Sequence, residues 1–190
     1  ISIRWFVVVV LAFSVIVMAL RGAEEVLGPV LALESYGGAA GWAVVLACMS
    51  VGLLIGALTA SRIKVKHPMF VGMLATLALP LWLVTLALAL PLAVVALGAF
   101  AWGMAIEFFQ VFWFTTIQTH IPREAISRVS SYDAMGSLMF GPIGLALAGP
   151  LVTAVGLQWS FLIAAAICLV AILASLFSRS VRTLEMEQTA

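Results

Sequence analysis

The sequence is poor in charge. Only 9% of its 190 residues are Asp, Glu, Lys or Arg, whereas 65% are hydrophobic, and the mean hydropathy is +1.24. A soluble domain carries about 25% charged residues and is about half apolar. The composition therefore excludes an ordinary soluble domain and predicts an integral membrane protein.

The sequence also lacks the residues that several kinds of site require. It has no Asn, so it offers no N-glycosylation acceptor. Its two cysteines, Cys48 and Cys168, lie in separate apolar segments, which favours two small hydrophobic side chains. Its two histidines, His67 and His120, have no second ligand at metal spacing. We expect no metal, no cofactor and no nucleic-acid partner, and we expect no enzyme, since no nucleophile pairs with a base.

Long apolar runs are what the sequence has in abundance. A membrane-spanning helix needs about 20 mainly apolar residues. We expect an all-α integral membrane fold in the lipid bilayer, with a six-helix bundle over residues 1–178 and a cytoplasmic tail over 179–190. The predicted spans are about 4–31, 41–61, 69–89, 91–118, 129–153 and 157–178. We expect Pro80 to kink the third span, and the Gly-Pro pairs to bend or end others.

The basic residues lie on one side of these spans. Loops near 32–40, 90 and 154–157 carry no Lys or Arg. The positive side of a membrane protein is cytoplasmic, so both termini are predicted to lie inside. The basic residues on that side are Arg4, Arg62, Lys64, Lys66, Arg123, Arg128, Arg179 and Arg182.

The order of helix types repeats after the third span. Spans one and four carry polar residues, spans two and five are rich in glycine, and spans three and six are nearly featureless. Two such trios start on opposite sides of the membrane, which predicts inverted three-helix repeats, a feature of secondary transporters. We expect the polar helices to line a cavity, the glycine-rich helices to pack closely, and the plain helices to face lipid.

Two polar stripes are candidate binding surfaces. At about 100° per residue, each stripe lies on one helix face. On the fourth span the stripe consists of Gly103, Glu107, Gln110, Phe114 and Gln118, and bulky Trp102, Phe109, Phe112 and Trp113 fall on the far side. On the first span the stripe consists of Ser14, Arg21, Glu24, Glu25 and Gly28.

Each stripe allows two interpretations. Glu107 lies near the middle of its span, where an acidic residue costs about 2.5–3.5 kcal/mol on insertion scales. It could bind a proton or a cationic part of a substrate in alternation, or it could stay protonated and hydrogen-bonded to another helix. Gln110 and Gln118 could contact substrate or bond across helices. Arg21, Glu24 and Glu25 could form an outer gate or an ion-pair cluster near the headgroups.

Two stretches of the sequence resemble the major facilitator superfamily. GLLIGALTASRIKVKHP (52–68) is similar to its glycine-then-basic loop in a degenerate second-half form. IQTHIPREAISRVSSYDAMGS (117–137), followed by GPIGLALAGP (141–150), looks like the C-terminal half of bacterial exporters in the macrolide-efflux and enterobactin-exporter-like branch. The resemblance covers essentially the whole chain.

The resemblance implies that the chain corresponds to helices seven to twelve of a twelve-helix transporter whose N-terminal half is absent. Helices seven and ten would then line the cavity, and helices eight and eleven would face the other half. It implies a multidrug antiporter of the bacterial inner membrane that exports a lipophilic small molecule in exchange for protons, with sodium as the alternative ion. Contacts between the halves would involve Arg62, Lys64, Arg128 and Asp133.

The alternative is a six-helix protein that is complete in itself. Two such units could form a dimeric transporter or channel, rebuilding a twelve-helix shell. A non-transporting scaffold or sensor is a further alternative, and it predicts a bundle without a cavity.

Overall fold

The protein is almost entirely helical. A computed structural model describes the backbone of residues 4–184, with the side chains of residues 129, 132, 133 and 136–138 left outside the description. The first helical segment comprises α1 (Arg4–Arg21), the π-helix η1 (Gly22–Leu27) and α2 (Gly28–Ser35). The other helices are α3 (Ala39–Arg62), α4 (Pro68–Ala75), α5 (Ala78–Ala87), α6 (Leu92–His120), α7 (Arg123–Val155), α8 (Leu157–Phe177) and α9 (Arg179–Arg182).

Five helical segments within the described residues are long and apolar enough to cross a bilayer. They are Arg4–Ser35, Ala39–Arg62, Pro68–Ala87, Leu92–His120 and Leu157–Phe177. This agrees with the predicted all-α class and with a multi-pass membrane protein. The sixth predicted span, 129–153, lies within the continuous helix α7, whose described apolar part is Met139–Val155.

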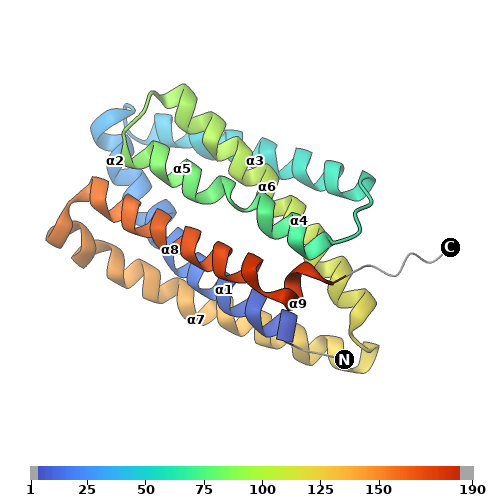
Figure 1. Cartoon of the computed structure of the whole chain (residues 1–190). Coiled ribbons are helices and arrows are strands. Elements are labelled where there is room, and N and C mark those ends of the chain that lie inside the picture. The colour runs from blue at the N-terminus through green and yellow to red at the C-terminus, as the bar shows by residue number, and fades with distance from the viewer. Residues whose placement is uncertain (1–3, 185–190) are drawn as a thin grey trace.

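The helices form two layers (Figure 1). In one layer α3 packs along α6, and α4 and α5 contact α6 from the other side. In the other layer α1 packs against both α7 and α8. The layers are joined where α5 and α4 contact α8. The main core therefore lies between α6, α4–α5, α8 and α1.

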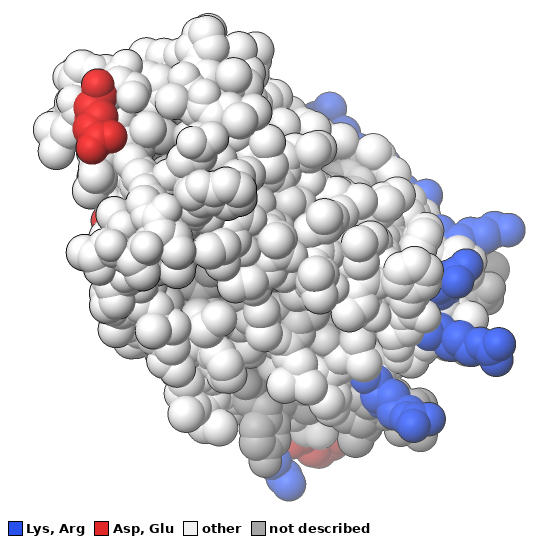
Figure 2. All heavy atoms as spheres, turned by 60° about the vertical axis from the view of Figure 1, so that its left-hand side comes forward, with Lys and Arg blue, Asp and Glu red and all other residues white. Residues whose placement is uncertain are grey.

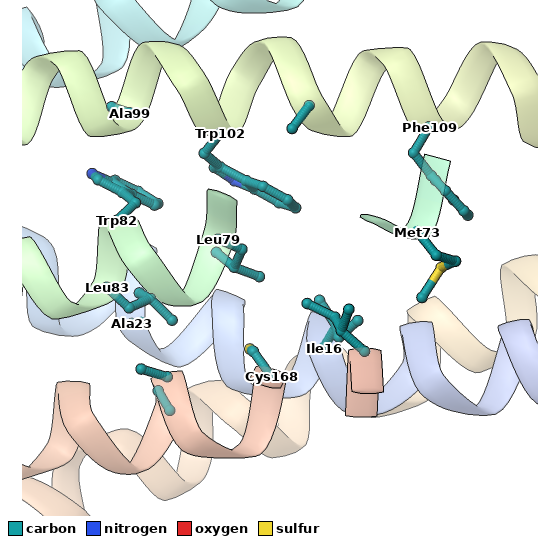
Figure 3. Close-up of a cluster of buried hydrophobic side chains, with 14 of the residues drawn as sticks. Ile16, Ala23, Met73, Leu79, Trp82, Leu83, Ala99, Trp102, Phe109 and Cys168 are labelled. Carbon is teal, nitrogen blue, oxygen red and sulfur yellow. The ribbon is translucent and has the colours of Figure 1, made fainter. Parts of the chain in front are cut away.

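The featureless third segment is central in this core (Figure 3). Met73, Leu79 and Trp82 of α4 and α5 point between α6 on one side and α1 and α8 on the other. In the most apolar 18-residue stretch of Pro68–Ala87, 50% of the residues are buried within the chain. In the corresponding stretch of the glycine-rich Ala39–Arg62, only 22% of the residues are buried. The expectation that plain helices face lipid therefore does not hold for the buried side of this segment, because its apolar side chains fill the space between the two layers.

Glycines allow the closest helix contacts, as expected. A Cβ at Gly52 of α3 would lie 2.2 Å from the carbonyl oxygen of Phe100 on α6. A Cβ at Gly144 of α7 would lie 1.8 Å from the carbonyl oxygen of Met18 on α1. Both contacts lie within the chain, so these glycine faces are already occupied by α6 and α1.

Proline reshapes two of the segments. The predicted kink of the third span is confirmed: α4 ends at Ala75 and α5 begins at Ala78, because Pro80 cannot donate to a carbonyl and its ring clashes with the residue four positions earlier. Pro29 acts differently. The helix continues through it, but the preceding turn widens into η1, where the Gly28 N–H donates to Ala23 O, five residues back.

Lys and Arg side chains gather over one end of the molecule (Figure 2). α1 begins at this end, and α9 packs there against α1, α4 and α8, with Val181 fully buried. The first residues of the predicted tail are thus folded onto the bundle. Residues 185–190 of that tail lie outside the described part of the chain.

Candidate functional site

A cavity of about 470 Å³ lies between α1 and α6, where the two layers face each other. It extends along α1 from Val9 to Glu24, a length of about 22 Å at 1.5 Å per residue. Its lining consists of Val9, Phe13, Ile16, Val17, Leu20, Arg21, Glu24, Trp102, Ile106, Phe109, Gln110 and Trp113. The cavity is therefore elongated, runs across much of the bundle, and is mostly apolar.

The polar groups of the cavity come from one end of α1 and one position on α6. Arg21 and Glu24 lie at the junction of α1 and η1, whereas Gln110 of α6 directly follows Phe109, whose ring stacks on Phe13, and so lies toward the other end of the cavity. Arg21 also donates to the Glu25 carboxylate and packs against Gly141 of α7. The guanidinium is thus held by a neighbour, while Glu24 is half-buried on the cavity side.

The two neighbouring acids of the π-helix η1 have different surroundings. π-turns occur as local insertions in α-helices, and they are frequent at functional sites. Consecutive side chains of a helix point in different directions, so Glu24 lines the cavity whereas Glu25 is exposed beside Arg21. The stripe predicted from the sequence groups both acids on one broad face, but only Glu24 lines the cavity.

Stacked aromatic rings form the opposite end of the cavity. Phe13 of α1 and Phe109 of α6 stack with centroids 4.3 Å apart, and Phe109 stacks on Trp113 at 6.1 Å. Phe6 stacks on Trp113 at 5.5 Å, and Trp5 contacts the same indole edge to face. These rings join α1 to α6 and lead to the basic end of the molecule, where Trp5 also meets His120.

The stripe predicted on α6 is only partly directed into the cavity. Gln110 lines it, and Glu107 is half-buried without being part of the lining. Phe114 is 51% exposed and Gln118 is also exposed. Gly103 packs instead on α3, where a Cβ would lie 2.2 Å from Met49 O. The glycine end of the stripe thus contacts α3, and its far end lies on the surface.

The aromatic face of α6, expected on the far side, is the face that lines the cavity. Trp102, Phe109 and Trp113 all contribute to the lining and are at most 2% exposed. Sequence reasoning missed them because it assigned bulky apolar side chains to packing alone. The sequence did contain a pattern that could have indicated them. The first span carries aromatic residues at Phe6 and Phe13, which stack on Trp113 and Phe109 of α6.

The stripe predicted on the first span is divided among three environments. Arg21 and Glu24 line the cavity. Ser14 is buried away from it, and its hydroxyl donates to Val10 O at 2.8 Å. Gly28 faces α3, where a Cβ would lie 2.3 Å from the Trp42 ring.

The residues expected to contact another half lie at the basic end, apart from the cavity. Arg62 ends α3, Lys64 lies in the loop before α4 and Arg128 lies near the start of α7, and all three are exposed. The side chain of Asp133 falls outside the described residues. At the opposite end, the Tyr36 hydroxyl donates to Leu90 O at 2.8 Å, which ties the α2–α3 turn to the α5–α6 turn.

This arrangement can hold an elongated apolar or aromatic molecule against ring faces, while the Glu24 carboxylate and the Arg21 guanidinium contact a polar group at one end and the Gln110 amide lies nearer the aromatic rings. Among the described residues, no group of three or more His, Cys, Asp or Glu side chains is close enough to hold a metal ion. Comparison of the chain with protein-family models, with curated proteins and with solved structures finds no match.

Proposed function

We propose that the chain is the six-helix half of a secondary active transporter that moves a lipophilic small molecule by alternating access. The observation that carries the proposal is the cavity between α1 and α6, with an aromatic wall and with Arg21, Glu24 and Gln110 as its polar groups. The relation to the major facilitator superfamily rests on the loop sequences at 52–68 and 117–150.

The helix pairing supports a two-repeat organisation. The first polar helix, α1, packs on the second glycine-rich helix, α7, and the second polar helix, α6, packs on the first glycine-rich helix, α3. Likewise α1 contacts the second plain helix, α8, and α6 contacts the first plain segment, α4–α5. Exchanging the two trios leaves this set of neighbours unchanged, as expected for inverted repeats.

The orientation we propose follows from the basic end of the molecule. With Lys and Arg on the cytoplasmic side of a bacterial inner membrane, the aromatic end of the cavity faces the cytoplasm and the Arg21–Glu24 end faces outward. The stacked rings of Phe13, Phe109 and Trp113 then close the inner end, so opening toward the cytoplasm requires α1 and α6 to separate there.

The coupling acid is proposed from two candidates. Glu24 lines the cavity beside Arg21, and a carboxyl in that position can exchange a proton as cargo or solvent enters. Glu107 is the candidate from the sequence, since it lies near the middle of its span. We propose Glu24 as the more favoured coupling acid because it lines the cavity and Glu107 does not. Either acid would act by taking up and releasing a proton.

Efflux from cells that express the native gene product tests this proposal. A fluorescent lipophilic dye is loaded, and its pH-driven efflux is compared between the parent, Glu24→Gln and Glu107→Gln. We expect Glu24→Gln to reduce efflux at least tenfold and to flatten its pH dependence. Glu34→Gln is the matched control, because Glu34 is an exposed acid on α2 outside the cavity. If both substitutions in the spans leave pH-driven efflux at the parent rate, the proton-coupling role is wrong.

A further inference from the structure

A second hollow lies on another face of α1, along its seam with α8. It is an open groove of about 690 Å³, with Val8, Leu11 and Val15 on one wall and Val170, Ala171 and Ala174 on the other. Leu11 is 61% exposed and Val170 is 66% exposed, so the groove opens to the surface. α8 presents the small side chains of Ala166, Ala171 and Ala174 to it. In a membrane-spanning bundle, this surface faces lipid hydrocarbon.

A basic hollow lies at the end of the molecule toward which this groove leads. Its volume is about 540 Å³, and it is lined by His67, Arg179, Arg182 and Thr183. The two arginines belong to α9, which is fixed to the bundle because Val181 is fully buried and Leu184 packs against the core. α9 is therefore held against the bundle, and both arginine side chains are exposed at the surface.

The groove and the basic hollow adjoin through α8 and α9. Ser175 is the groove residue nearest the end of α8. The helix ends at Phe177, the backbone is extended at Ser178, and Arg179 begins α9, which packs against both α8 and α1. On the other wall, Arg4 precedes Val8 by one turn of α1. Each wall of the apolar groove thus ends in an arginine at the basic end, where a bilayer places its headgroups.

We propose that this groove and hollow bind one anionic phospholipid of the leaflet at the basic end. Its phosphate lies between Arg179 and Arg182, and one acyl chain lies in the groove between α1 and α8. Arginine binds phosphate through paired N–H donors, and basic pockets between membrane helices select anionic headgroups. The site is separate from the transport cavity, since Phe13 and Val17 face the cavity whereas Leu11 and Val15 face the groove.

The headgroup part is tested by native mass spectrometry of the purified chain in detergent. Phosphatidylglycerol and phosphatidylcholine with identical acyl chains are titrated separately, and the fraction of protein carrying one lipid is measured. We expect phosphatidylglycerol to bind at least tenfold more tightly. The double variant Arg179→Gln with Arg182→Gln should remove this preference, and Arg179→Lys with Arg182→Lys should keep most of it.

The matched control is Arg62→Gln with Lys64→Gln, which removes the same charge from an exposed loop at the same end. It should change phosphatidylglycerol binding less than twofold. An equal loss in this control would mean that the attraction is diffuse, and it would overturn the proposed site.

The groove part is tested by filling it. Ala174→Trp should reduce binding of both lipids at least tenfold, because the indole occupies the acyl-chain path. Ala47→Trp places the same side chain on an exposed position of α3 and should leave binding unchanged. Circular dichroism is used to check that each variant is folded. If Ala174→Trp does not fold, Ala174→Leu is tested in its place. Unchanged lipid binding in a folded Ala174 variant would overturn the proposal.

Discussion

At the scale of single residues, Tyr36 shows how one side chain can join two turns. Its hydroxyl donates to Leu90 O at 2.8 Å, so it ties the turn after α2 to the turn before α6. Tyr36→Phe removes only this bond. We expect unfolding in detergent to become easier by about 0.5–1.5 kcal/mol, the usual net contribution of one hydrogen bond. The parent protein is the reference.

The pH dependence of this bond follows from the ionisation of Tyr36. Burial raises the pKa of the phenol above its ordinary value of 10.0. The folded state thus favours the neutral form, and this contribution to stability is complete below the unfolded pKa and is lost as the pH rises through the folded pKa. The difference in stability between the parent and Tyr36→Phe should therefore be constant at neutral pH and shrink above about pH 10. A difference that shrinks on acidification instead would contradict this account.

Glycine packing gives a second prediction at this scale. A Cβ at Gly52 would lie 2.2 Å from Phe100 O, so Gly52→Val must push α3 away from α6. Overpacking of this kind costs about 1–3 kcal/mol. Gly149→Val is the control, since no atom lies within 4 Å of the position a Cβ would take there. Thermal unfolding of the two variants, side by side, measures the difference, and equal midpoints would exclude a tight α3–α6 contact.

Some cavity residues were predictable from the sequence and others were not. Arg21, Glu24 and Gln110 stand out because a polar side chain in an apolar run has few reasons to be there. Trp102 and Trp113 do not, since hydropathy cannot tell a ring that lines a cavity from one that packs in the core or faces lipid. Glu25 was grouped with the cavity residues because the predicted stripe was broad, whereas in the structure its carboxylate is exposed and pairs with Arg21.

At the scale of helices, aromatic rings hold α1 and α6 together at one end of the cavity. Phe13 and Phe109 stack with centroids 4.3 Å apart. A double-mutant cycle with Phe13→Leu and Phe109→Leu should give a coupling of about 0.5–1.5 kcal/mol, the range for aromatic pairs. Unfolding free energies of the four proteins in detergent provide the measurement. A coupling near zero would mean that the two rings stabilise the bundle independently.

The positions of helices along the chain were easier to predict than their neighbours. Apolar runs of sufficient length identified the five long segments, and Pro80 identified the break between α4 and α5. Nothing in an apolar run specifies which helix it contacts. The third segment reads as featureless in the sequence, yet Leu79 and Trp82 are at most 1% exposed, because the segment lies between the two layers.

At the scale of the whole molecule, α3 presents the most open surface of the five long segments. Leu54 is 68% exposed and Leu58 is 58% exposed on this helix. Lipid, a covalently linked half or a second copy of the chain could each cover such an apolar face. The mass of the native gene product, measured on membranes of the source cells, is the first test. The proposed half-transporter predicts a polypeptide of about twice this length, in line with a twelve-helix shell.

Crosslinking then distinguishes a partner half from a second copy. We expect Leu54→Cys to form no disulfide-linked homodimer in membranes if another half covers α3. Leu81→Cys, on an exposed position of α5, is the control for random collision. A homodimer that forms at Leu54→Cys but not at Leu81→Cys would favour the self-contained six-helix alternative.

The interlaced pairing of helices has a consequence for how the chain is made. α3 finds its closest partner, α6, only after α4 and α5 have been synthesised, and α1 finds α7 later still. While the ribosome is translating the middle of the chain, the glycine surface of α3 has no protein surface to meet and is exposed to lipid or to the insertion machinery. Stable packing of either trio therefore has to wait for the other, so the bundle becomes resistant to quality-control proteolysis late in synthesis.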